Sequence, residues 1–492
     1  MDVSHQKIAS IKQSLILSAR NIQDGDYAKA LVVLEESTKN SLNKTPSESL
    51  LLSLIQSFSD LAVIFEDEGS YEKIKACYMN EIRIYEHLLS RNFDIIENTK
   101  CVAGIFNRLA TLYANNHSIE DAKEIYKKEM LLYNKLAHHH PHDSQYEKNI
   151  AFALSSLGYL LRDSDEGAAQ EYLEMALDTY ERISDNLFQD EKFNLEHGKT
   201  VRYITGIYEN QGKFRKILRL HKKIIDSIED VYGSAQYRDA FLLTIVTKKE
   251  INWAKIKLLG YVYASLGITF DKLGKEKRSM EYNLNAAWTY HLIVRHGMDW
   301  FPYEVRKEME GIGAYYLSQN KFRAAVPYYE RLREYSEIIV DYAEFHVPSA
   351  LEISTYRQIL HALGIIYYNT DKQEDSIAVY KKLLHLCRKY LKSSPDDLIL
   401  QYEMANIYIR LANSLSANDQ LTKAKYAFDR SKSIRKEIIT KDPDFPFESS
   451  WEETYHEGYA LLNLKMGKNK AAKKHIEELG RDFESFKGQF LE

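Results

Sequence analysis

The chain has 492 residues, enough for several domains, but it contains only 8 Pro and 20 Gly. Hydrophobic residues make up 45% and charged residues 28% of the chain, a balance that argues against an intrinsically disordered or a membrane-embedded protein. The formal net charge of -5, with both signs interleaved, offers no basic field to nucleic acid or to an anionic membrane. We therefore expect one continuous run of helices with no nucleic-acid partner.

Three cysteines, Cys77, Cys101 and Cys387, form no CxxC pair and leave an odd count. This pattern argues against a disulfide framework and is typical of a reducing compartment. The amino-terminal segment lacks a small-residue cleavage site, and nowhere do about 18 apolar residues follow one another. These features predict a cytoplasmic protein without a membrane-spanning segment.

Taken in chain order, ten segments align on one pattern, in which a large residue precedes a small one and an aromatic residue or Leu follows about three positions later. The first and tenth segments match less well, with Asn21 and Asn463 at the aromatic position. The clearest examples are residues 151–161, 261–275, 310–322 and 361–372. Successive small residues lie 44 to 51 positions apart, except for one interval of 62 between the fifth and the sixth. The ten small residues are Ser18, Ala62, Ala110, Gly158, Thr205, Gly267, Gly313, Gly364, Ala412 and Ala460.

In several units a polar turn follows, then a small residue and an aromatic residue four positions on, as in Ala325 and Tyr329 after Asn320 or Ala122 and Tyr126 after His117. Two antiparallel helices approach closely only where a small side chain lies at their crossing, and a nearby aromatic side chain fills the groove beside it. Because one pair cannot bury both of its faces, pairs must stack. The sequence therefore predicts an all-α fold, an α-solenoid of about ten antiparallel helix pairs.

This pattern resembles the tetratricopeptide repeat, whose first helix carries a Leu-Gly-x-x-Tyr core and whose second helix carries Ala-x-x-x-Phe. The spacing of about 48 residues exceeds the family's basic period of about 34 and implies longer helices or added linkers. The resemblance implies a non-catalytic scaffold that binds a peptide or a protein surface in its concave groove. An alternative is a ligand-responsive signalling regulator whose superhelical pitch changes on binding.

The interval of 62 residues divides the predicted array. We expect five pairs in residues 1–230, an irregular seam or an extra helix in 231–260, and five pairs in 261–492. New helices are expected at Thr45-Pro46-Ser47-Glu48, a capping box with Pro at the first helical position, and at the similar segment Ser394-Pro395-Asp396-Asp397.

In the tetratricopeptide family the ligand usually contacts first-helix residues that point away from the crossing. Transferring those offsets, three positions before the small residue and one, four or five after it, gives a polar lining of mixed sign. Amide side chains there suit peptide recognition, and Arg202 and Lys272 suit a carboxylate. The predicted partner-binding residues are Asn107, Tyr159, Arg202, Glu209, Asn210, Lys272, Glu310, His361, Tyr368, Asn369 and Asn413.

Two other ligands are disfavoured. One subfamily binds the acidic tails of chaperones with a Lys three positions before the small residue and an Asn just after it. The nearest matches are Asn107 with Thr111 and Arg202 with Gly206, which lack that pair. The Asn and Tyr side chains of the predicted groove would also suit single-stranded RNA, but the net charge argues against it.

The sequence contains no GxxxxGK[ST], HExxH, GxSxG, GxGxxG or EF-hand motif, so we predict a protein that is not an enzyme and has no cofactor. The tract from His138 to His142 is the most metal-like segment, because imidazole binds zinc, copper and nickel. Adjacent residues do not share one helix face, and Pro141 interrupts the run. We therefore expect a loop on the surface rather than a metal site.

Overall fold

The computed structural model of the chain describes residues 3–42, 46–184, 186–233, 251–296, 301–341, 350–447 and 450–491. Across these residues the structure contains 21 α-helices and no β-strand, and the helices hold 85% of the residues. The predicted all-α fold is confirmed. The scarcity of Gly and Pro accounts for helices that mostly continue for 16 to 21 residues.

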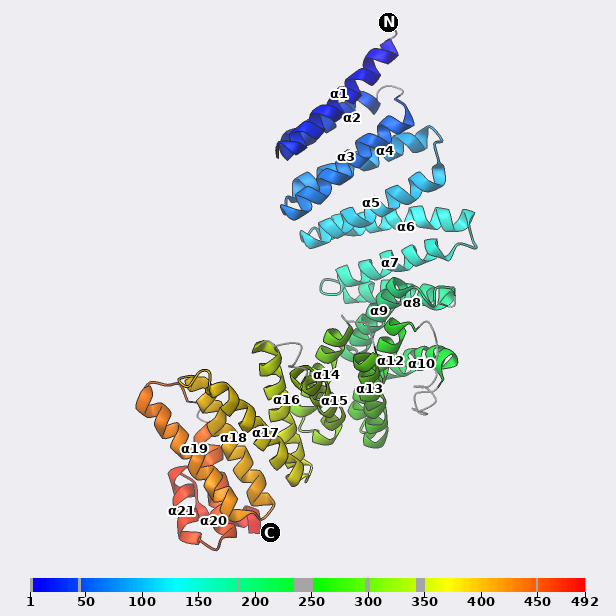
Figure 1. Ribbon diagram of the computed structural model, residues 1–492. Coiled ribbons are helices and arrows are strands. Elements are labelled where there is room, and N and C mark those ends of the chain that lie inside the picture. Colours follow the sequence, from blue (N-terminus) through cyan, green and yellow to red (C-terminus); the bar gives the residue numbers. More distant parts are fainter. Residues whose placement is uncertain are drawn as a thin grey trace. The chain divides into compact units, whose positions relative to one another are not determined.

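Within the described residues, the helices follow one another as ten pairs and one further helix (Figure 1). The first helices of the pairs are α1 (Val3–Gln23), α3 (Glu48–Asp67), α5 (Ile95–Asn115), α7 (Ser144–Leu161), α9 (Glu191–Asn210), α12 (Trp253–Lys272), α14 (Phe301–Ser318), α16 (Ala350–Asn369), α18 (Leu398–Ala417) and α20 (Ser450–Lys465). The second helices are α2 (Tyr27–Leu42), α4 (Tyr71–Ser90), α6 (Ile119–His139), α8 (Glu166–Ile183), α10 (Phe214–Tyr232), α13 (Glu276–His296), α15 (Phe322–Asp341), α17 (Gln373–Leu391), α19 (Leu421–Lys441) and α21 (Asn469–Glu478). The last helix is α22 (Phe483–Leu491).

The chain divides into two compact units, Met1–Leu220 with Lys248–Lys255 and His221–Thr247 with Ile256–Glu492. In each unit the main helix contacts join helices that are adjacent or next but one along the chain. Each unit is therefore a stack in which a helix pair depends mainly on its neighbours. The predicted seam at 231–260 lies largely outside the described residues. The division into 1–230, 231–260 and 261–492 therefore stays a prediction.

The small residue predicted at each helix crossing is buried in all ten first helices. The glycines among them show why a larger side chain does not fit. A Cβ atom added to Gly313 would lie 2.7 Å from the ring of Tyr329, and one added to Gly364 would lie 2.3 Å from the ring of Tyr380. Both tyrosines come from the second helix of the same pair, as the pattern predicts.

The turn between the two helices of a pair recurs at a fixed number of positions after the small residue of the crossing. In nine of the ten pairs, the residue seven positions after the small residue has a φ between 53° and 77°. The next backbone N–H donates to the carbonyl of the residue three positions after the small one, at 2.7 to 2.9 Å. This is the Schellman arrangement, which satisfies a carbonyl at the helix end. In the α7–α8 pair, by contrast, the N–H of Asp165 donates to the carbonyl of Leu161 at 2.7 Å.

Two helix starts differ from the prediction. Helix α3 begins at Glu48 with Ser47 as its N-cap, so Pro46 precedes the cap, and Thr45 lies outside the described residues. Helix α18 begins at Leu398, and the carboxylate of Asp397 accepts the N–H of Leu400 at 2.9 Å. In the second case Asp offers the same capping bond as Ser and adds a favourable charge at the helix N-terminus.

One described helix, α3, is long and apolar enough to cross a membrane by length and composition. Eight of its side chains, among them Leu54, Phe58 and Phe65, are buried. They belong to a core that also includes residues of α2 and α4. Packing against neighbouring helices therefore accounts for the apolar composition of α3.

We predict that Gly313→Ala and Gly311→Ala change stability in opposite directions. An added methyl group at Gly313 would displace the Tyr329 ring and cost about 1 to 3 kcal/mol. Gly311 lies in the same helix, but a Cβ atom there would have no neighbour within 4 Å, so Ala should stabilise the helix by up to about 1 kcal/mol. Denaturant unfolding followed by circular dichroism measures both changes. Equal stabilities for the two variants would contradict the close approach of α14 and α15.

Candidate functional site

A pocket of about 620 Å³ lies in the second unit, where the turns of three successive helix pairs meet. Its walls come from the α12–α13 turn, the α14–α15 turn and the end of α16. Its volume falls in the range of about 300 to 1,000 Å³ that is common for ligand sites. The lining residues are Asp271, Glu276, Lys277, Ser279, Met280, Asn320, Lys321, Phe322, Arg323, Ala324, Asn369 and Thr370.

Three basic and two acidic side chains line this pocket. Lys321 Nζ lies 2.5 Å from Asp271 Oδ2, and this ion pair joins the turns of two successive pairs. Lys277 and Arg323 are exposed. Pro327 lies inside α15. The pocket wall combines cationic and apolar side chains.

Five of the predicted partner-binding residues lie in the first unit, and two of these hold neighbouring helices together. Asn107 Nδ2 on α5 lies 3.2 Å from each carboxylate oxygen of Glu129 on α6. The Tyr159 hydroxyl on α7 lies 2.8 Å from the hydroxyl of Thr200 on α9. The others are Arg202 and Glu209, which are half-buried, and Asn210, which is exposed.

The other six predicted residues lie in the second unit. Asn369 contributes to the wall of the pocket. Glu310 forms an ion pair with Arg306 one turn earlier on α14, with 3.4 Å between Oε1 and Nε. The remaining four are His361 and Asn413, which are half-buried, and Lys272 and Tyr368, which are exposed. Partner binding by either set of residues remains a prediction.

Two buried carboxylic acids occupy equivalent places on successive second helices. Glu81 on α4 is 1% exposed and Glu129 on α6 is 2% exposed. Burial raises the pKa of Glu81 to about 7, although the guanidinium of Arg108 lies 3.4 Å from its Oε2 and opposes the shift. Burial raises the pKa of Glu129 to about 8, against the hydrogen bond from Asn107. The signal in the sequence was a Glu at a position where the repeat pattern places a small or apolar residue.

The histidine tract differs from the predicted loop, because His138 and His139 form the last turn of α6. The helix ends at the next residue since Pro141 disfavours a helical conformation for the residue before it. His138, His139 and His142 are exposed, and His140 is half-buried. Among the described residues, no group of three potential metal ligands includes this tract.

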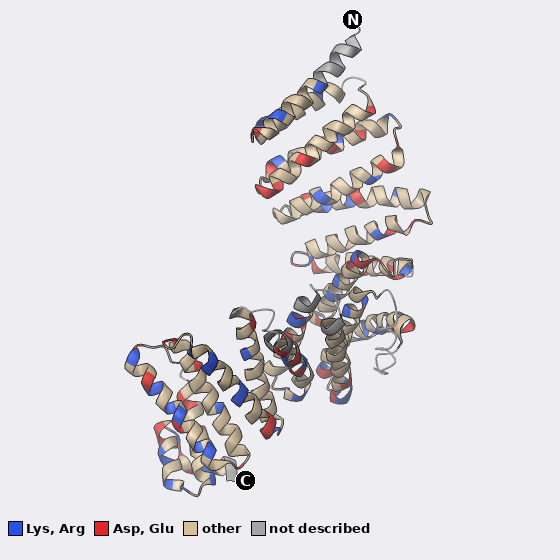
Figure 2. Ribbon diagram, viewed as in Figure 1, with Lys and Arg blue, Asp and Glu red and all other residues tan. Residues whose placement is uncertain are grey.

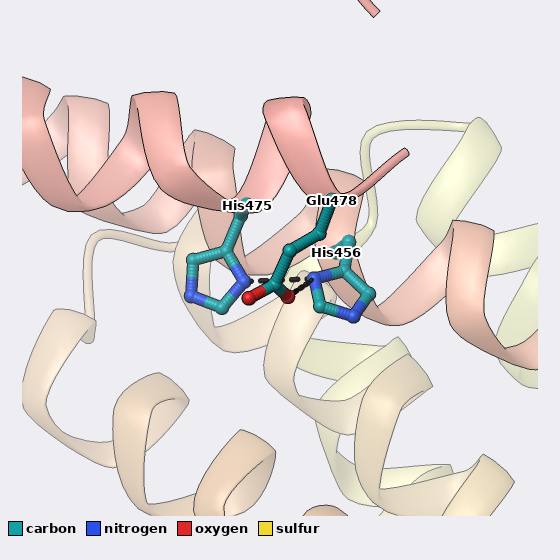
Figure 3. Close-up of side chains that lie close together, drawn as sticks. All are labelled: His456, His475 and Glu478. Atoms are coloured by element: carbon teal, nitrogen blue, oxygen red, sulfur yellow. Dashed lines mark hydrogen bonds and ion pairs between the residues drawn. The ribbon is translucent and has the colours of Figure 1, made fainter. Parts of the chain in front are cut away.

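A group of three potential ligands lies instead at the last helix pair of the second unit, where His456 on α20 meets His475 and Glu478 on α21 (Figure 3). The candidate ligand atoms all lie within 4.8 Å of one another. Burial lowers the pKa of both histidines, and with the further effect of His456 the pKa of His475 falls to about 4. The sequence analysis missed this group because 19 positions and a turn separate the two histidines.

A small residue packs against a side chain of the second helix at the helix crossings, as the tetratricopeptide-like pattern predicts. The described residues form a tandem array of such helix pairs. No family model and no curated protein matches the chain.

Three solved structures are similar to the chain over much of their length. BtubC (BKLC) from P. vanneervenii is 19% identical, with 56% of this chain and 96% of that chain covered and a TM-score of 0.27. The apo form of RapI is 12% identical, with 87% and 98% covered and a TM-score of 0.32. The apo form of the quorum sensor NprR from B. thuringiensis is 11% identical, with 88% and 100% covered and a TM-score of 0.33.

We predict that Glu129→Gln makes stability less dependent on pH. The pKa of about 8 in the folded state lies above the ordinary value of 4.5, so folding takes up a proton between these pH values. The contribution of this group to stability is therefore full below about pH 4.5 and is lost as the pH rises to about 8. The variant should match the parent near pH 5 and exceed it by roughly 1 to 3 kcal/mol at pH 9.

Urea unfolding at pH 5, 7 and 9 measures this difference. Glu120→Gln is the matched control, because it removes an acid from an exposed position of the same helix. A constant difference between parent and Glu129→Gln at all three pH values would show that Glu129 is ionised in the folded protein.

Proposed function

We propose that this protein is a non-catalytic scaffold that binds a peptide or protein segment carrying a carboxylate, with the pocket of the second unit as its docking point. The observation that carries the proposal is the pocket itself, which exists only because three successive turns stack in one register. A stack of helix pairs presents a long, continuous surface, and a pocket within it can hold the anchoring group of an extended ligand.

The chemistry of the pocket wall supports a peptide ligand. Lys277 and Arg323 supply cationic donors for a carboxylate, either a side chain or a chain terminus. Met280 and Phe322 add apolar surface for an aliphatic or aromatic anchor. This combination suits one or two residues of a partner rather than a nucleic-acid backbone.

The pocket and the predicted first-helix surface share Asn369, at the end of α16. A bound segment could therefore continue from the pocket along the first helices of the second unit, past Tyr368 and His361. Basic and acidic residues alternate along the described helices, so no broad field of one sign selects the partner (Figure 2). Recognition then depends on local groups such as those in the pocket. We propose the cytoplasm as the compartment of the protein.

We predict that Lys277→Glu with Arg323→Glu weakens peptide binding at least about tenfold without lowering the melting temperature, because these exposed cations would pair with the ligand carboxylate. The ligands are peptides selected from a random display library on the full chain, and isothermal titration calorimetry gives their dissociation constants. The control is Lys425→Glu with Lys436→Glu, which makes the same charge change at exposed positions of α19.

A second variant distinguishes the two candidate surfaces. Arg202→Ala with Lys272→Ala removes the two cations of the predicted first-helix lining and leaves the pocket intact. Loss of binding in this variant, with full binding in the pocket variant, would move the docking point away from the pocket. The selected peptides should compete with one another for one site. If none of them does, the proposed scaffold function is contradicted.

A further inference from the structure

The last helix pair of the second unit brings three metal-binding side chains to one point. His475 and Glu478 lie three positions apart on α21 and so share one face of that helix. His456 reaches the same point from α20 (Figure 3). His456 Nδ1 lies 2.9 Å from His475 Nδ1 and 3.0 Å from Glu478 Oε2. A nitrogen of one helix thus faces two ligand atoms of the other.

Hydrogen bonds alone cannot satisfy all three of these ligand atoms well. The Nδ1 atom of a neutral imidazole is either a donor or an acceptor. If His456 Nδ1 carries the proton, it must share that proton between His475 and Glu478. If it does not, its lone pair faces the carboxylate at 3.0 Å. A cation at the centre would instead use the lone pairs of all three atoms.

We infer that His456, His475 and Glu478 form a site for one divalent transition-metal ion, with zinc as the best match. Two imidazoles and one carboxylate are a common zinc ligand set, with water in the fourth tetrahedral position. Ligand atoms about 2.0 to 2.1 Å from a tetrahedral zinc lie about 3.3 Å apart. Two of the distances, 2.9 and 3.0 Å, would have to open by only a few tenths of an ångström, and the third pair of ligand atoms, which lies within 4.8 Å, would have to reach the same spacing.

Aromatic side chains hold the two imidazoles in place. The ring of His475 lies edge-on to that of Tyr459, with centroids 4.7 Å apart, and the ring of His456 lies edge-on to that of Tyr455 at 5.2 Å. The Tyr459 hydroxyl donates to Asp429 on α19 at 2.8 Å, which fixes that ring. These contacts restrict the positions that the two imidazole rings can take.

The ion would tie α21 to the rest of the stack. Helix α21 has 10 residues, whereas the second helices of the other described pairs have 16 or more. Helices shorter than about 12 to 15 residues are marginal by themselves. Ala472 and Ile476 of α21 share a small core with Phe483 and Phe486 of α22, so a bridge from α20 to α21 would also hold the last helix. The inferred role of the metal is structural, and it does not depend on the proposed peptide binding.

The test uses the full chain in a background that removes the competing tract. His138, His139, His140 and His142 are replaced by Asn, and Zn²⁺ binding is measured by calorimetry. We expect one Zn²⁺ per chain in this background. Adding Glu478→Gln, at a largely exposed position, or His475→Asn should lower the affinity more than about a hundredfold, since even outer-shell changes typically cost about 10- to 100-fold.

Two further measurements distinguish a specific metal site from nonspecific Zn²⁺ binding. Hydrogen exchange of residues 469–478 should slow on Zn²⁺ addition in the background and stay unchanged in the Glu478→Gln variant, while circular dichroism shows that both fold. Co²⁺ should give the visible spectrum of a four-coordinate ion in the background alone. Equal Zn²⁺ affinity with and without the substitutions at His475 and Glu478 would overturn the inference. Loss of all Zn²⁺ binding when the four histidines of the tract are replaced by Asn would overturn it as well.

Discussion

The close approach of two helices at one small residue is the constraint on which the rest of this structure depends. At Gly313 and Gly364 the partner tyrosine lies where a Cβ atom would be, so the identity of one residue sets the distance between the helices of a pair. The turn keeps a fixed spacing from this residue, because the carbonyl three positions later accepts the Schellman bond in nine of the ten pairs. Crossing and turn are thus one repeated unit of backbone geometry, and the pocket follows from its repetition.

Such a scaffold allows polar groups inside the stack where a pair can satisfy them locally. Glu129 keeps its buried place beside the amide of Asn107, and Ser155 and Tyr159 meet Thr200 across two first helices. Each of these contacts joins helices that are adjacent or next but one along the chain. A buried acid with a raised pKa costs stability at neutral pH, and the chain has one at equivalent positions of α4 and α6.

The sequence was sufficient for the repeat because one contact recurs ten times and each occurrence supports the others. The sequence pattern alone predicts Gly364 at the crossing with Tyr367 after it. It also predicts Tyr380 as the aromatic residue that covers Gly364. Helix starts were less predictable at Pro46 and Ser394, since several neighbouring residues can cap and the local charge decides among them. The pocket and the His456 cluster were not predictable, because both join side chains that only the folding of one turn onto another brings together.

The proposed docking pocket and the inferred metal site both lie where the chain departs from the repeat. Pro327 replaces a donor in the first turns of α15, and the second helix of the last pair is shortened to the 10 residues of α21. Each departure acts on the few helices that it touches, because each helix pair depends mainly on its neighbours. The pocket depends on the turns of three successive pairs, and the metal cluster depends on the last pair and the tyrosines beside it. The proposed peptide binding and the inferred metal binding can therefore be changed separately.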